Sequence, residues 1–122
     1  MDGKLTMIEL LSDADLPAGF TYPHEFGRIV DLGLLDLEPW NILHGKILEL
    51  RYHGMRERYP DRQLVPFAAR TDNDDVACWE HGSSEIIIVH DFAEPGWEKR
   101  GSYPSFYDWL RKAVDDLIDF DS

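Results

Sequence analysis

The chain has 122 residues, of which 43% are hydrophobic and 12% aromatic, so its composition excludes a disordered chain and suits one folded domain over residues 1–122. Its 24 acidic and 12 basic residues give a formal net charge of −12 at pH 7. Because a negative field of this size repels phosphate groups, nucleic acid and anionic membranes are excluded as expected partners.

Two features of the chain predict a cytoplasmic location. The only cysteine, Cys78, has no disulfide partner in the chain, which is typical of a reducing compartment. The first residues include an acid, Asp2, where a signal peptide has basic residues, and the longest aliphatic run is Ile86 to Val89. We therefore expect neither an export signal nor a membrane span.

Three helices are predicted before the sheet. Apolar residues at helical spacing predict a short amphipathic helix over Asp2 to Ser12 and a second helix from about Pro23 to Gly33. Pro39 is predicted at the first position of a third helix, which runs towards Tyr59 with two apolar stripes. An irregularity is expected in it at His53-Gly54, because glycine costs about 1 kcal/mol relative to alanine inside a helix.

The end of this third helix lies in a basic part of the chain. Residues 39–70 contain six basic and three acidic residues, whereas the segments on either side are acidic. The tract from Arg56 to Arg62 is either a recognition site or the last turn of the helix, where the macrodipole stabilises each cation by about 0.3–1 kcal/mol. Pro60 ends the helix at this point, and we favour the structural interpretation.

Three consecutive strands are predicted over Leu64 to Arg70, Val76 to Glu80 and Glu85 to His90. Short polar turns separate them, which predicts an antiparallel meander. The third strand has four successive apolar residues, so both of its faces are expected to be covered in the middle of the sheet. The expected core includes Phe67, Trp79, Ile86 and Ile88.

Residues 92–101 contain Pro95, Gly96 and Gly101 and are predicted to form a loop. Trp97 lies in this loop beside charged residues, and two interpretations stay open. Its ring is either an exposed interface anchor or a group that folds back on the core.

The last helix is predicted to begin after a capping box formed by Ser105 and Asp108. Its apolar face comprises Phe106, Trp109, Leu110, Ala113, Val114 and Leu117. The acids Asp115, Asp116, Asp119 and Asp121 crowd its C-terminal turns, where the helix dipole disfavours negative charge. Either the helix frays and these acids are solvated, or a partner uses them.

Motifs for metal binding and catalysis are weak. Asp72, Asp74 and Asp75 do not follow the calcium-loop pattern, and the five histidines are not spaced as zinc ligands, so we expect no metal and no cofactor. His90-Asp91 is a candidate acid–base pair for a small hydrolase. Neighbouring strand residues point to opposite faces, however, so a hydrolase is the weaker interpretation.

Several of these stretches together resemble the SUKH superfamily, the group of the yeast cell-wall assembly regulator and many bacterial immunity proteins. They are Leu64-Val-Pro-Phe-Ala68, Asp75-Val-Ala-Cys-Trp79, the strand ending His90-Asp91, Ser105-Phe-Tyr-Asp-Trp-Leu110 and the upstream Leu16-Pro-Ala-Gly-Phe20. The chain has Asp74-Asp75 where the family usually has Gly-Asp. Asn73 or Asp74 is therefore expected to take the left-handed conformation at the hairpin tip.

The resemblance implies an α+β domain in which the N-terminal helices and a C-terminal helix pack on one side of a mostly antiparallel central sheet. It also implies a binding protein that is not an enzyme: an immunity protein that neutralises a toxin by direct contact, or a regulatory adaptor. The acidic surface fits a basic protein partner such as a nuclease toxin. The expected contact residues are Asp72, Asp74, Asp75, Glu80, Asp91 and Trp97.

Overall fold

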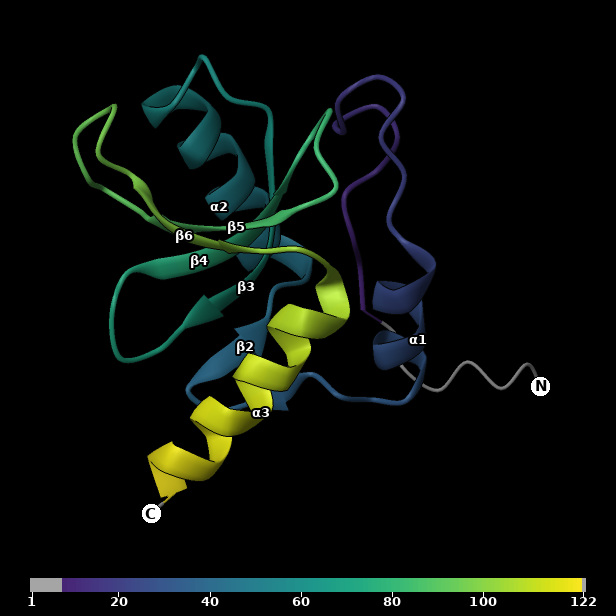
Figure 1. The fold of residues 1–122 in the computed structure, drawn as a ribbon. Helices are drawn as coiled ribbons and strands as arrows, with labels where there is room; N and C mark the ends of the chain where they lie inside the picture. Colours follow the sequence, from purple (N-terminus) through teal and green to yellow (C-terminus); the bar gives the residue numbers. More distant parts are fainter. Residues whose placement is uncertain (1–7, 122) are drawn as a thin grey trace.

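The chain folds into one antiparallel sheet with helices on both faces, as Figure 1 shows. The computed structural model describes residues 8–121. The six strands lie in chain order: β1 (Asp36–Leu37), β2 (Trp40–Ile42), β3 (Leu64–Arg70), β4 (Asp75–Glu80), β5 (Ile86–His90) and β6 (Lys99–Tyr103). Helix α2 (Gly45–Arg58) covers one face, and α1 (His24–Asp31) and α3 (Phe106–Asp121) cover the other.

The predicted α+β class and the predicted meander are confirmed. Strands β3, β4 and β5 are consecutive and antiparallel, and β5 pairs with β4 on one side and β6 on the other. The four residues expected in the core, Phe67, Trp79, Ile86 and Ile88, are all buried. The helices, however, cover both faces of the sheet and not one side only.

Aromatic rings fill the layer between the sheet and α1 and α3. The ring of Phe67 lies with its centroid 4.4 Å from that of Trp79 and 4.8 Å from that of Trp109. Phe26 of α1 meets Trp79 edge-on at 5.1 Å. Contacts of this geometry contribute about 0.5–1.5 kcal/mol per pair beyond the burial of apolar area.

The start of α3 is as predicted. The backbone N–H of Asp108 donates to Ser105 Oγ at 3.2 Å, and the Ser105 hydroxyl donates to Asp108 Oδ2 at 2.8 Å. The end differs from the fraying alternative, because the helix continues to Asp121.

Two predictions in the N-terminal half are wrong. Residues 8–12 are not helical, and the rest of that predicted helix, residues 1–7, lies outside the described residues. Pro39 does not begin a helix; it follows a cis peptide bond with Glu38 and leads into β2. The reason is tertiary packing, since Trp40 of β2 pairs with Arg70 and packs edge-on against Trp109 at 5.5 Å.

Helix α2 has no break at Gly54. The helix runs without interruption from Gly45 to Arg58. A Cβ atom at Gly54 would lie 2.9 Å from Nη1 of Arg58, so the glycine makes room for that guanidinium. The expected irregularity is therefore absent, and the glycine instead leaves space for the Arg58 side chain on the helix surface.

Two loop predictions also change. Part of the predicted loop over residues 92–101 belongs to β6, an edge strand that pairs only with β5. At the hairpin tip, neither Asn73 nor Asp74 has a positive φ, and Asn73 Oδ1 instead accepts a hydrogen bond from the Asp75 N–H at 2.8 Å. Among the described non-glycine residues, Phe92 alone has a positive φ, of 68°.

Candidate functional site

Most of the basic residues in the middle segment, residues 39–70, form ion pairs with acids of the same chain. Four arginines of this segment pair with acids that follow them in the sequence: Arg51 and Arg58 with Asp91, Arg62 with Glu80 and Glu98, and Arg70 with Asp72 and Asp116. The structural interpretation of the Arg56–Arg62 tract is therefore supported in a different form. Two of its arginines, Arg58 and Arg62, fasten the end of α2 and the following turn to the sheet.

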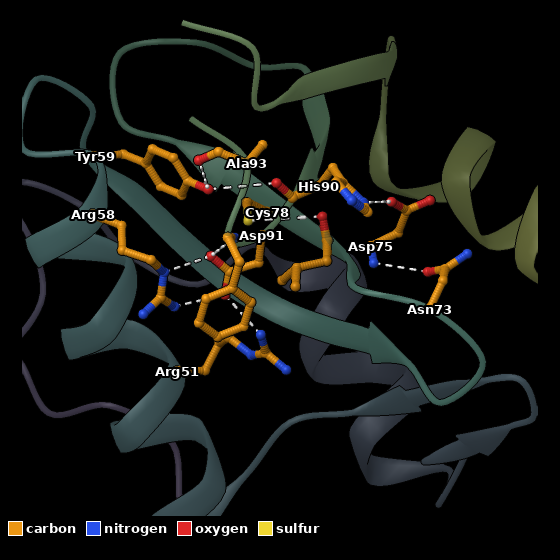
Figure 2. A network of polar contacts seen from close by, with 11 residues as sticks. Arg51, Arg58, Tyr59, Asn73, Asp75, Cys78, His90, Asp91 and Ala93 are labelled. Atoms are coloured by element: carbon orange, nitrogen blue, oxygen red, sulfur yellow. Dashed lines mark hydrogen bonds and ion pairs between the residues drawn. The ribbon is translucent and has the colours of Figure 1, made fainter. Parts of the chain in front are cut away.

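Asp91 is the centre of this network, which Figure 2 shows from close by. Arg58 donates from Nε to Asp91 Oδ1 at 2.8 Å and from Nη2 to Oδ2 at 2.6 Å. Arg51 donates from Nη1 to Oδ2 at 2.7 Å, and the Phe92 N–H donates to Oδ1 at 2.9 Å. The two arginines are seven residues apart, which is two helical turns, so α2 presents both to the same carboxylate.

The sequence folds this way because Asp91 continues the alternation of β5. Ile87 and Val89 pair with Cys78 and Val76, and these side chains share the face beneath α2. Burial acts to raise the pKa of Asp91, but hydrogen bonds from Arg58 and Arg51 outweigh it, and its pKa lies below the ordinary value. The carboxylate is thus charged and has no exposed surface.

A second group of contacts holds the segment between β5 and β6. Arg62 donates from Nε to Glu98 Oε2 at 2.6 Å and from Nη1 to Glu80 Oε1 at 2.9 Å. The hydroxyl of Tyr59 donates to the backbone oxygens of Ala93 and His90, at 3.2 and 3.4 Å. This segment is therefore anchored to the C-terminal end of α2.

The structure separates the predicted contact residues. Asp91 is buried beneath α2, and Glu80, at the far end of β4 from the hairpin tip, is paired with Arg62. Asp75 Oδ1 lies 3.1 Å from His90 Nδ1 and 3.6 Å from Arg100 Nε. These three acids already have partners within the chain.

The other predicted residues are more accessible. Asp74 is exposed at the hairpin tip, and Trp97 is 81% exposed, so its ring does not fold back on the core. Asp72 is exposed and pairs with Arg70, whose Nη1 also donates to Asp116 Oδ2 of α3 at 3.2 Å. One guanidinium therefore joins the hairpin tip to the acidic end of α3.

This junction gathers carboxylates from three elements into one surface. We call it the acidic end and define it as Glu38, Asp72, Asp115, Asp119 and Asp121. Glu38 and Asp121 line a hollow of about 640 Å³ with the apolar side chains of Leu117, Ile118 and Phe120. Helix α3 continues to Asp121, so the predicted fraying is wrong, but Asp115, Asp119 and Asp121 are exposed as that alternative expects. Asp116 differs from both alternatives, because it accepts a hydrogen bond from Trp40 Nε1 at 3.0 Å.

The helix end is electrostatically unfavourable. Asp115 and Asp119 lie four residues apart on the same face of α3, where like charges repel, and both lie in its C-terminal turns. Lys112 offsets part of this repulsion through Asp116 Oδ1 at 2.9 Å. Among the described residues, no hydrogen bond or ion pair joins the carboxylates of Asp115, Asp119 and Asp121, and all three residues are exposed.

The geometry gives less support to a metal site or to a catalytic site. Within residues 8–121, no group of three or more histidine, cysteine, aspartate or glutamate side chains is arranged to hold a metal ion. His90 contacts Asp75, while Asp91 points to the opposite face, and no described serine, threonine or cysteine donates to His90. Burial raises the pKa of the Cys78 thiol well above its ordinary value.

Fold and site together define an α+β domain with a buried arginine–carboxylate network and a separate acidic end. Comparison with protein-family models, with curated proteins and with solved structures finds no match to this chain. None of the helices in the described part of the chain has the length and apolar character needed to cross a membrane.

Proposed function

We propose that this chain is a protein-binding domain that holds a basic partner protein at the acidic end, in the manner of a SUKH-type immunity protein. The observation that carries the proposal is the contact of Arg70 with both Asp72 and Asp116. It joins two acidic stretches that are far apart in the sequence into one surface.

The surface has the composition of a binding site for a basic protein. Exposed carboxylates lie beside apolar side chains, among them Ile118 and Phe120, which are 58% and 48% exposed. Apolar groups in such a surface supply area that is removed from water, and the surrounding charges select the partner and speed its approach. Repulsion between the acids is relieved when cations of the partner dock between them.

A basic nuclease toxin is the partner class that this proposal favours, because its nucleic-acid groove is lined with cations that match a field of carboxylates. The alternative is a regulatory adaptor at the same surface. The two roles differ in what the partner does alone: a toxin partner arrests growth when expressed without this chain, and an adaptor partner does not.

The experiment is affinity capture from lysate of the source cells with three immobilised proteins. They are the natural chain, an Asp115→Asn/Asp119→Asn/Asp121→Asn variant, and an Asp61→Asn/Glu85→Asn control at the opposite end of the sheet. We expect a basic protein on the natural chain and on the control but not on the first variant. Equal capture by all three would refute the role of the acidic end.

A further inference from the structure

A second exposed surface differs in character from the acidic end. We call it the Phe92 surface and define it as Ile47, Leu50, Arg51, Arg58 and Phe92, which together line a shallow hollow. Ile47, Leu50 and Phe92 are 68%, 63% and 64% exposed. The four members from α2 lie on one side of that helix, because their spacings of three, one and seven positions are those of one helical face. They are Ile47, Leu50, Arg51 and Arg58. Three large apolar side chains are thus exposed side by side.

The backbone at Phe92 is held in an unfavourable conformation. Its φ of 68° lies in the left-handed region, which a bulky side chain rarely adopts. The Asp91 carboxylate accepts the Phe92 N–H at 2.9 Å, and the Arg58 guanidinium carbon lies 4.1 Å from the centre of the Phe92 ring. The buried network therefore fixes an aromatic ring in solvent, and residues held in such conformations cluster at binding sites.

The charge of the Phe92 surface is opposite to that of the rest of the molecule. Asp91 supplies one carboxylate to two guanidinium groups, so one positive charge is left over in a chain of net charge −12. The side chains of Arg51 and Arg58 are 25% and 28% exposed. Nη1 of Arg58 and Nη2 of Arg51 donate to no described group.

The geometry points to the Phe92 surface as the docking site of a partner segment that carries apolar side chains beside a carboxylate, such as one face of an acidic amphipathic helix. Its apolar side chains pack on Ile47, Leu50 and Phe92, and its carboxylate accepts from the unused N–H groups of the two arginines. An adjoining hollow of about 480 Å³, which includes Leu35, Leu43 and Ile47 in its lining, receives a further apolar side chain. This inference does not rest on the acidic end, which has the opposite charge.

The test uses a short synthetic amphipathic peptide of leucine, alanine and glutamate, titrated into the isotope-labelled full chain and followed by NMR. Salt of about 0.15 M screens the repulsion between the peptide and distant acids beyond about 8 Å. We expect shifts at Leu50, at Phe92 and at the side-chain N–H groups of Arg51 and Arg58. Matched peptides with lysine for glutamate, or with serine for leucine, should not shift them.

Two variants make the expectation quantitative. Leu50→Ser should weaken peptide binding roughly tenfold, whereas Leu32→Ser, which alters a leucine that is also 63% exposed, should leave it unchanged. Phe92→Gly should weaken binding and yet keep or raise the melting temperature, because glycine adopts positive φ without strain.

Three results would overturn the inference. One is the absence of shifts at this surface. Another is equal weakening of peptide binding by Leu32→Ser and Leu50→Ser. The third is a dimer in sedimentation that Leu50→Ser dissociates, since a second copy of the chain would then be the occupant.

Discussion

Arg58 and Asp91 form a two-pronged ion pair beneath the surface of the molecule, with donor–acceptor distances of 2.8 and 2.6 Å. The pair joins the last residue of α2 to the residue that follows β5, and Gly54 leaves the space in which the guanidinium lies. Arg51, on the same face of α2 as Arg58, also donates to Asp91. The stability of the domain and the position of Phe92 therefore depend on the same carboxylate.

Removing the Asp91 charge should be strongly destabilising. Asp91→Asn leaves two arginines facing a neutral group, and we expect the free energy of unfolding to fall by about 3 kcal/mol. This value is at the lower end of the range for breaking a buried ion pair, because both arginines are partly exposed to water. Glu80→Gln, at a partly exposed pair, should lose less than about 1 kcal/mol. Urea unfolding measures both, and equal losses would contradict a special role for Asp91.

The same carboxylate should shape the pH dependence of stability. Its pKa in the folded state is below the ordinary value of 3.8, so the folded state binds its proton less tightly than the unfolded state does. The stabilisation is therefore complete above about pH 4 and is lost as the pH falls through the folded-state pKa. Unfolding free energies measured from pH 7 downwards should fall less steeply below about pH 4 for Asp91→Asn than for the natural chain or Asp74→Asn.

Gly54→Ala should reveal the space that Arg58 occupies. Alanine favours the helix by about 1 kcal/mol, but its methyl group would crowd an atom of Arg58 that lies 2.9 Å away. We expect the full gain in an Arg58→Ala background and a smaller gain, or a loss, in the natural chain. A double-mutant cycle measures the difference. Identical gains in the two backgrounds would show that the guanidinium moves aside freely.

The packing of α3 is tested by two variants of one helix. Trp109 is packed among aromatic rings and is 1% exposed. Trp109→Ala should lower the free energy of unfolding by about 3–5 kcal/mol. Ser105→Ala removes the capping contact with Asp108 and should cost about 1 kcal/mol. Comparable losses in denaturant melts would mean that the ring does not pack as described.

Local pattern was enough to predict the elements whose signal does not depend on distant residues. The apolar runs of β3 to β5 and the Ser105 cap are of this kind. Trp40 to Ile42 fits a helical stripe as well as a strand, and distant contacts decide for the strand: its pairing with β3 and the packing of Trp40 against Trp109. The sequence does not predict strand β6, because an edge strand with a mostly exposed surface has no apolar alternation.

The sequence predicts only part of the candidate site, because the ion pairs of the site join residues that are far apart in the chain. The sequence shows that acids are numerous, but it does not show which of them are neutralised within the fold. Asp91 carried a usable signal, because it follows Ile87 and Val89 in the two-residue alternation of a buried strand. An acid in that phase predicts an internal cation, and Arg51 and Arg58 are spaced to supply two. The contact of Arg70 with both Asp72 and Asp116 had no local signal.

The association rate constant between this chain and its captured partner, measured across a salt series, tests the role of the acidic end most directly. Asp115→Lys/Asp119→Lys should lower the rate roughly tenfold at low salt, and the difference should shrink as screening shortens to about 8 Å at physiological ionic strength. Asp61→Lys/Glu85→Lys, with the same change in net charge at the other end of the sheet, should have a much smaller effect. Equal rates for the two variants at low salt would contradict binding at the acidic end.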